Sequence, residues 1–286
     1  MAIPLLIENT DTLEDFAARA LAAPWLGLDT EFVRDRTYFP RAGLIQIATP
    51  DEIALVDPVT LSQLLPLAPL LFDSAMPKVL HAATQDMELF FCLFERLPTP
   101  VFDTQVAAAQ LAFTPQISHA ALVGEMLQAD TPPALGRYNW LRRPLQAQAI
   151  EYAAGDVAHL GALYQRLSAQ LEQQDKTAAF DQAMRSVVNP ERYRPQPERA
   201  WKRIRARRRL DDKALARLKA LARWREEQAI RQDLPRQWIL RDNLLAVLAR
   251  QAPRNAAELA DIHVLKATSR RRYGRDLLRL IADANY

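Results

Sequence analysis

The fold is constrained most strongly by residues 24–60, where three short apolar stretches are separated by turn-forming residues. The stretches read WLGLDTEFV, LIQIATP and IALVDP; they are brief, rich in branched and aromatic side chains, and bounded by Pro, Gly and Asp. This pattern predicts three β-strands joined by tight connections. A helix is predicted before them over 12–22, and further helices are predicted on either side of a short strand at KVLHA. The alternation predicts an α/β domain with a mixed sheet.

A linker is predicted near residue 190, because the segment NPERYRPQPER contains three prolines and has no apolar periodicity. Before it, apolar residues at three- and four-residue spacing predict helices at 122–129, 144–174 and 178–188. Beyond it, the same spacing predicts four helices, at about 201–231, 239–250, 255–262 and 268–284. The sequence therefore predicts an α/β domain at 1–188, a Pro-rich linker at 189–200 and a small all-α domain at 201–286.

The charges divide unevenly along the chain. Residues 1–190 contain 12 Lys and Arg against 22 Asp and Glu, whereas residues 191–286 contain 25 against 12. An acidic body joined to a basic module suggests a protein that meets a polyanion. The run KRIRARRR at 202–209, with Lys202, Arg203 and Arg205, is the best candidate for contacts with a phosphate backbone. A solvated arginine-rich face is the alternative.

Cysteine usage and hydropathy exclude several classes of protein. Cys92 is the single cysteine, which excludes an intrachain disulfide framework and a thiolate cluster for zinc or iron–sulfur ligation. No stretch reaches the roughly 18 apolar residues that a membrane span requires, and no basic leader precedes the apolar stretch at the N-terminus. We therefore expect a soluble, cytoplasmic protein with no membrane partner, in which oxygen ligands hold any metal.

Five residues supply four carboxylates and one phenol in settings that allow them to converge. Asp29 and Glu31 lie two apart on a predicted strand, so their side chains share a face. Tyr152 and Asp156 lie four apart on a predicted helix and share a face there. Asp86 lies where a short strand gives way to a helix, a natural position at the rim of a cleft. We therefore expect the three elements to form one site.

Four carboxylates in one site repel each other unless cations neutralise them or their pKa values rise. Oxygen-only ligands select hard ions such as Mg²⁺ or Mn²⁺. Two such ions about 3.5–4 Å apart suit an in-line displacement at phosphorus, so phosphodiester hydrolysis is the predicted reaction. Each motif taken alone has a structural explanation, since Asp-x-Glu can be a surface pair and Asp86 can cap a helix. The set as a whole favours the two-metal interpretation, with Tyr152 positioning the attacking water.

These segments resemble a known family. LDTEFVRDRTYFPRAGLIQIA, VLHAATQDMELF, FDTQVAA, NWLRRPL and YAAGDVAHL are similar to the ribonuclease D family, which belongs to the DEDD superfamily of 3′→5′ exonucleases, in its tyrosine-containing subclass. The tail, notably LARLKALARWREEQAIRQDLPRQWILRDNLLAVLAR and RRYGRDLLRLI, resembles the helicase-and-RNase-D C-terminal (HRDC) domain. Together the similar segments extend over about residues 24–283.

The resemblance implies an RNase H-like exonuclease domain with two Mg²⁺ or Mn²⁺ ions, followed by one HRDC-like nucleic-acid-binding domain. It implies removal of nucleoside 5′-monophosphates from RNA 3′ ends, typically in tRNA maturation, by a monomer. Asp29, Glu31, Asp86 and Asp156 take the places of the metal ligands, and Tyr152 takes the place of the tyrosine that positions the nucleophile.

This chain departs from the family pattern at two places near the predicted site. Pro132 and Pro133 stand where relatives often carry an Asp-Lys pair, which removes a basic group that would contact substrate. Gly155 stands where alanine is usual, and glycine loosens a helix slightly.

Further residues near these segments are candidates for substrate contacts. Thr30, His81, Arg142 and Arg143 are the candidates in the first domain, although hydrogen-bonded or packing roles are the alternative. Four tryptophans either stack on bases or belong to the core, which is more usual in helices; they are Trp140, Trp201, Trp224 and Trp238. Two other functions remain open from sequence: a DNA-directed 3′→5′ repair exonuclease, and an RNA-binding protein whose catalytic site has lapsed.

Overall fold

The computed structural model describes residues 3–73 and 75–284. The chain forms two compact units. Unit 1 comprises Met1–Val33 and Pro40–Arg194, and unit 2 comprises Arg34–Phe39 and Pro195–Tyr286. The junction between Arg194 and Pro195 falls inside the predicted linker. The sequence does not predict that Arg34–Phe39 belongs to unit 2.

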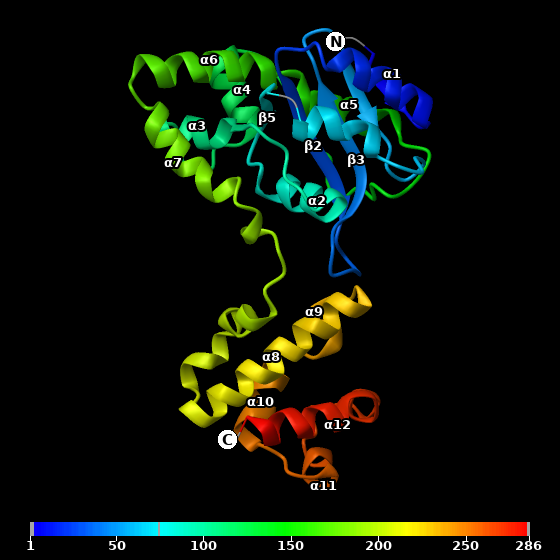
Figure 1. Cartoon of the computed structure of the whole chain (residues 1–286), viewed down its shortest axis with the longest axis vertical. Coiled ribbons are helices and arrows are strands. Elements are labelled where there is room, and N and C mark those ends of the chain that lie inside the picture. The colour runs from blue at the N-terminus through cyan, green and yellow to red at the C-terminus, as the bar shows by residue number, and fades with distance from the viewer. Residues whose placement is uncertain (1–2, 74, 285–286) are drawn as a thin grey trace. The chain divides into compact units, whose positions relative to one another are not determined.

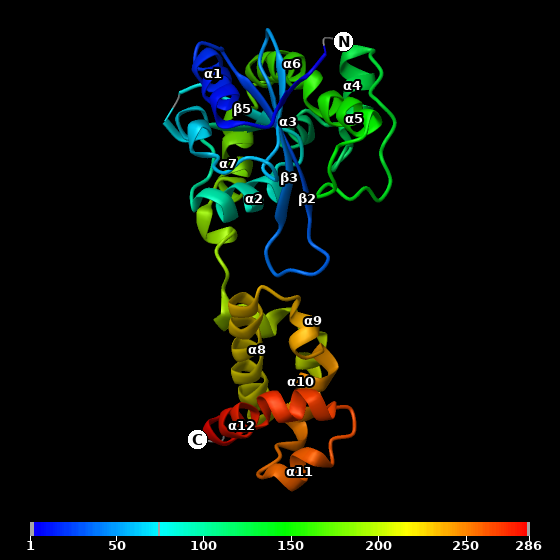
Figure 2. The same cartoon turned by 90° about the vertical axis from the view of Figure 1, so that its right-hand side faces the viewer.

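Unit 1 is built on a six-stranded mixed sheet with the strand order β1-β4-β3-β2-β5-β6. The three strands predicted within 24–60 are β2, β3 and β4, which form an antiparallel run. Figure 2 shows β2 and β3 side by side. The other three strands pair in parallel, β1 with β4, β5 with β2, and β6 with β5. The strand bounds are Leu5–Ile7, Leu26–Val33, Arg41–Ala48, Ile53–Val56, Lys78–Leu80 and Val101–Asp103.

Both faces of this sheet are buried. On β3, Leu44 packs with Ala149 and Ala153 of α5, whereas Ile45 and Ile47 belong to the larger core on the opposite face. Alternation of side chains along a strand explains why neighbouring residues enter different cores. The helices of unit 1 are α1 (Thr10–Ala20), α2 (Thr84–Phe94), α3 (Thr104–Gln110), α4 (His119–Leu127), α5 (Ala147–Ala158), α6 (Leu160–Gln173) and α7 (Thr177–Val187).

Two predicted helices of unit 1 differ in detail from the structure. The helix expected before KVLHA is a short 3₁₀ turn, Leu65–Leu67, followed by a π-helical turn, Pro69–Asp73, because prolines interrupt the segment. The long helical pattern after Pro144 is divided at His159 into α5 and α6.

Unit 2 is helical, and its longest helix, α8 (Asp212–Gln232), contacts α10 and α12 (Figure 1). The remaining helices are α9 (Arg236–Ile239), α10 (Asp242–Gln251), α11 (Ala256–Ala260) and α12 (Ala267–Asp283). The helix predicted at 201–231 begins later than expected. Residues Pro197–Arg203 and Arg205–Arg209 form 3₁₀ turns, and α8 starts after Asp211, whose side chain caps it by accepting from the backbone N–H of Ala214.

The segment Arg34–Phe39 contributes to the core of unit 2 through Tyr38, which is 5% exposed. Its hydroxyl donates to Glu226 at 2.6 Å, and Arg236 donates to the same carboxylate and lies over the tyrosine ring. The backbone N–H groups of Tyr38 and Phe39 both donate to Asp233. The buried charge of Glu226 is thus paired and hydrogen-bonded, as burial requires.

Within residues 3–73 and 75–284, none of the helices combines the length and the apolar character that crossing a membrane demands.

Candidate active site

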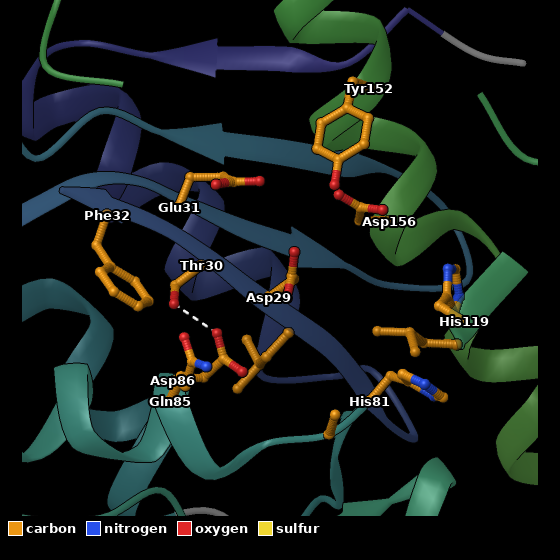
Figure 3. Close-up of a pocket in the computed structure, with 13 residues that line it drawn as sticks. Asp29, Thr30, Glu31, Phe32, His81, Gln85, Asp86, His119, Tyr152 and Asp156 are labelled. Carbon is orange, nitrogen blue, oxygen red and sulfur yellow. Dashed lines mark hydrogen bonds between the residues drawn. The ribbon is translucent and has the colours of Figure 1, made fainter. Parts of the chain in front are cut away.

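The predicted acidic residues of unit 1 line one pocket of about 520 Å³. Asp29 and Glu31 extend from the same face of β2, and Tyr152 and Asp156 extend toward them from α5 (Figure 3). Asp29, Glu31 and Asp156 each offer an oxygen such that all three oxygens lie within 4.8 Å of one another. Three carboxylates from two elements therefore come within reach of a single cation.

Asp86 lies in the first turn of α2 and lines the same pocket. It is outside the group of three close carboxylates, and its Oδ1 accepts a hydrogen bond of 2.5 Å from the hydroxyl of Thr30. Thr30 is one of the predicted substrate contacts, and it is almost fully buried. In this structure it therefore orients Asp86.

The turn before α2 is fixed by a residue that the sequence analysis did not single out. Asp103 is 1% exposed, and its carboxylate accepts from the backbone N–H groups of Ala82, Ala83, Gln105 and Val106. Ala82 has a φ of 56°, a left-handed conformation that an alanine adopts only when its surroundings hold it. Asp103 thus positions the start of α2. Asp103 lies in the segment FDTQVAA, which the sequence marks only as part of the family resemblance.

The carboxyl groups of the pocket have raised pKa values. Burial, followed by the charges of Asp86, Asp156 and Glu31, raises the pKa of Asp29 well above its ordinary value. Burial, with the charges of Asp156 and Asp86, raises the pKa of Glu31 to about 8. The cluster therefore favours protons or cations over four free anions.

The pKa values of the other two carboxyl groups, those of Asp86 and Asp156, are raised less. Burial raises the pKa of Asp86 to about 7, and the hydrogen bond from Thr30 opposes that rise. Burial raises the pKa of Asp156 to about 6, and the hydrogen bond from Tyr152 opposes it. Burial and the neighbouring carboxylates also raise the pKa of Tyr152 above its ordinary value, so the phenol keeps its proton near neutral pH.

Gly155 lies between Tyr152 and Asp156 on α5 and is packed closely by a loop. A Cβ atom at this position would lie 2.5 Å from both Cδ and Cγ of Pro132. A real Cβ does not approach ring carbons this closely without a shift of one of the two. The glycine therefore makes room for the proline, which the sequence analysis treated as a separate departure from the family.

Most of the other predicted substrate contacts in unit 1 have protein partners. His81 lines the pocket, and its ring nitrogens lie 2.8 Å from Thr104 Oγ1 and 3.0 Å from the carbonyl of Ile117. Arg143 forms an ion pair with the fully buried Asp57 and donates to the carbonyl oxygens of Gly43 and Trp140. These side chains support the fold around the pocket.

His119 lines the same pocket and was not identified from sequence. Its Nε2 is buried without a hydrogen-bond partner among the atoms that the structure describes. Burial, with the neighbouring His81 and His159, lowers its pKa to about 4, so the ring is neutral near neutral pH. It starts α4, and no feature of the segment SHAAL indicates proximity to the acidic residues.

The basic residues of unit 2 form a second charged region. The Arg205–Arg209 turn and Arg250 surround a pocket of about 580 Å³. Lys202, Arg203 and Arg205 are all exposed, and Arg203 also lies 3.7 Å from the buried carboxylate of Glu226. Within the described residues that line this pocket, no carboxylate is present.

The tryptophans divide between core and surface. Trp140, in the loop before α5, and Trp224, on α8, are both 6% exposed and belong to the cores. Trp201 is half-buried, with the ammonium of Lys219 4.8 Å from its ring. Trp238 is 59% exposed, so the usual expectation of a core position is wrong for this residue.

Comparison with known proteins identifies relatives of both units. A family model described as "3'-5' exonuclease" matches residues 4–172, and a model of the HRDC domain matches residues 214–281. Ribonuclease D of Gluconacetobacter diazotrophicus is 38% identical over 283 residues, covering 98% of this chain and 72% of that protein. Ribonuclease D of Pseudomonas paraeruginosa is 39% identical over 261 residues, covering 91% and 69%.

Solved structures agree with these matches. The crystal structure of Escherichia coli RNase D, described as an exoribonuclease involved in structured RNA processing, superposes with a TM-score of 0.91 at 34% identity. The superposition covers 99% of this chain and 75% of that one. The catalytic core of RRP6 from Trypanosoma brucei has the same fold, with a TM-score of 0.73 at 22% identity, covering 99% of this chain and 80% of that one.

Proposed function

Because this chain belongs to the ribonuclease D family of 3′→5′ exonucleases, we propose that it removes nucleoside 5′-monophosphates from RNA 3′ ends by metal-dependent phosphodiester hydrolysis. The family membership confirms two expectations from sequence: the RNase H-like exonuclease fold followed by a helical HRDC domain, and 3′→5′ exoribonuclease activity. The observation that carries the proposed chemistry is the set of carboxylate oxygens of Asp29, Glu31 and Asp156, all within 4.8 Å of one another.

The donor set fits two hard divalent cations, Mg²⁺ or Mn²⁺, because every candidate ligand atom is a carboxylate oxygen. Asp29, Glu31 and Asp156 would hold one ion, and Asp29 with Asp86, directly or through water, would hold the other. The raised pKa values support this proposal, because partly buried carboxylates at this density are disfavoured as free anions. When bound, two such metal ions would stabilise the attacking and leaving oxygens of an in-line displacement at phosphorus.

Tyr152 is proposed to orient the attacking water. Its raised pKa keeps the phenol protonated near neutral pH, and its hydroxyl hydrogen-bonds to Asp156. A protonated phenol holds a water molecule through its oxygen lone pair, but it does not remove a proton from that water. A positioning role therefore fits the electrostatics better than general base catalysis.

Unit 2 is proposed to hold the RNA backbone. The arginines of Arg205–Arg209 and Arg250, together with Lys202, gather positive charge where no carboxylate lines the pocket within the described residues, which favours phosphate groups. In unit 1, Arg142 is exposed and is proposed to contact substrate directly, whereas Thr30, His81 and Arg143 support the pocket through the contacts described above. We assign the exonuclease domain to 1–188, the linker to 189–200 and the HRDC-like domain to 201–286.

We further propose that structured RNA precursors with free 3′ ends, tRNA precursors among them, are substrates. The similarity to Escherichia coli RNase D supports this proposal, since that protein is described as an exoribonuclease involved in structured RNA processing. A precursor with a 3′ extension should lose nucleotides one at a time until the structured part of the RNA is reached. Uniform degradation through the structured part would contradict this assignment.

The decisive experiment uses uniformly labelled RNA with a free or a blocked 3′ end, in Mg²⁺ or in EDTA. We expect mononucleotides only from the free end and only with the metal, and we expect Asp29→Asn to abolish the reaction. Asp51→Asn, which changes an exposed carboxylate of unit 1, is the matched control and should retain activity. Internal cleavage, or activity that persists in EDTA, would overturn the proposal. A parallel DNA substrate measures the preference between the two nucleic acids.

A further inference from the structure

A pocket of about 560 Å³ in unit 2 lies at the C-terminal end of α9 and the starts of α10 and α12. Its buried apolar lining comes from Ile239, Leu240 and Leu244, all at most 6% exposed. Trp238 and Val264 also line it, and these two side chains are 59% and 57% exposed. An indole that remains mostly in water beside an apolar pocket presents a flat surface on which a planar ligand can stack.

The charged lining of this pocket is cationic, and its uncharged polar lining comes from Gln237, Asn243 and Ser269. Arg241 and Lys266 contribute positive charge, and no carboxylate is among the described residues that line it. The nearest acidic residue in sequence, Asp242, is already paired, since its Oδ1 lies 2.6 Å from Arg225 Nη1. The pocket therefore has two cations available to an anion.

The two cations also begin helices. Arg241 is the N-cap of α10 and Lys266 is the N-cap of α12, and neither side chain caps its helix. The backbone N–H groups of a first turn carry partial positive charge and favour anions. The positive charge of the pocket comes from the Arg241 and Lys266 side chains, and the partial charges of the two helix ends add to it.

We propose that this pocket binds one nucleotide of single-stranded RNA, with the base stacked on Trp238 and the phosphate held between Arg241 and Lys266. The proposal rests on the RNA-directed function above and adds a substrate-binding site to it. A protein partner is disfavoured because the exposed apolar surface is limited to two side chains flanked by cations. A duplex is disfavoured because its bases are stacked on each other and do not present a free face to the indole.

The test measures binding of a labelled single strand of about 12 nucleotides to the full-length protein in EDTA, where no hydrolysis occurs. We expect Trp238→Ala to raise Kd about 10-fold, which corresponds to about 1.4 kcal/mol, while Trp238→Phe stays within about threefold because stacking tolerates any aromatic ring. Trp201→Phe, at a half-buried tryptophan of the same unit, is the matched control. A far-UV melting curve for each variant verifies that unit 2 remains folded.

Two further measurements separate stacking from nonspecific attraction. RNA should quench tryptophan emission, and Trp238→Phe should lose most of that quenching while Trp201→Phe keeps it. Arg241→Gln and Lys266→Gln should each reduce the slope of log K against log salt by up to about 0.7, the value for the one single-strand phosphate that the two cations share. Arg254→Gln, at an exposed arginine outside the pocket, is the control for the loss of one positive charge.

The proposal is overturned if Trp238→Ala binds the single strand within twofold of wild type, or if RNA leaves the emission unchanged. It is also overturned if Trp238→Ala converts a dimer to a monomer at equal RNA affinity, since a second copy of the chain would then occupy the pocket. If hydrolysis still depends on Asp29 in either case, the proposed function stands and only the Trp238 site is lost. If the wild-type protein binds no RNA in EDTA, the Trp238 site is lost, and hydrolysis in Mg²⁺ decides the proposed function separately.

Discussion

The metal-free protein should become less stable as pH rises, because the carboxyl groups of the pocket are held protonated in the folded state. Burial, with the charges of Asp156 and Asp86, raises the pKa of Glu31 from 4.5 to about 8. In the unfolded chain this carboxyl loses its proton near pH 4.5, whereas in the folded protein it retains the proton until about pH 8. The folded state binds more protons over that interval, so the free energy of unfolding falls as pH rises through it.

The size of this effect follows from the shift. One pKa unit corresponds to about 1.4 kcal/mol, so Glu31 alone sets an upper limit of about 5 kcal/mol. Solvent screening at its partly exposed side chain reduces this value, and we expect a contribution of about 2 kcal/mol. The full contribution is present below pH 4.5, and it is lost by about pH 8.

Urea unfolding at pH 5 and pH 9 in EDTA measures this contribution. The decrease in unfolding free energy between the two pH values should be about 2 kcal/mol smaller for Glu31→Gln than for wild type. Glu14→Gln removes a carboxyl group at an exposed position of α1 and is the matched control. Its pH dependence of the unfolding free energy should equal that of wild type. Mg²⁺ should restore stability at pH 9, since a ligand that binds only the folded state stabilises it. An unchanged pH dependence in Glu31→Gln would refute the reasoning.

Three other substitutions test particular contacts. Tyr152→Phe should reduce single-turnover hydrolysis about 100-fold and leave Mn²⁺ affinity, measured by calorimetry, nearly unchanged; equal turnover would remove Tyr152 from the mechanism. Gly155→Ala should destabilise unit 1 by about 1–3 kcal/mol in urea, because its Cβ would meet Pro132 at 2.5 Å, and Pro132→Ala in the same chain should recover most of that loss. Tyr38→Phe removes the hydroxyl that donates to Glu226 at 2.6 Å and should lower the stability of unit 2 by about 1–3 kcal/mol. A thermal melt of unit 2 that does not respond to Tyr38→Phe would show that the contact contributes nothing to its stability.

The parts of the fold that sequence predicted are those with strong local signals. The strands within 24–60 were found because Pro, Gly and Asp bound them, and they form the antiparallel run of the sheet. The strand Leu5–Ile7 was missed because it has three residues and is formed through pairing with β4, nearly 50 positions away in the chain. The apolar pattern of a short segment does not indicate which distant strand it pairs with.

The residues of the candidate site also divide into those with a local sequence signal and those placed by tertiary packing. Asp29 and Glu31 share a strand face, and Tyr152 and Asp156 share a helix face, so periodicity alone indicates that each pair acts together. The position of His119 in the pocket depends on how α4 packs, which no feature of its own segment encodes. Tyr38 is a similar case, since its hydrogen bond to Glu226 joins residues 188 positions apart.

The two departures from the family pattern illustrate what only coordinates reveal. Taken from sequence, Gly155 loosens a helix and Pro132 removes a charged pair, and the two changes have no evident connection. In the structure they are in contact, and an alanine at 155 cannot coexist with the ring of Pro132 unless one of them moves. Since Gly155 lies between Tyr152 and Asp156, any such movement is transmitted to two residues of the pocket. The glycine and the proline therefore depend on each other, because the space that Gly155 leaves is the space that the ring of Pro132 fills.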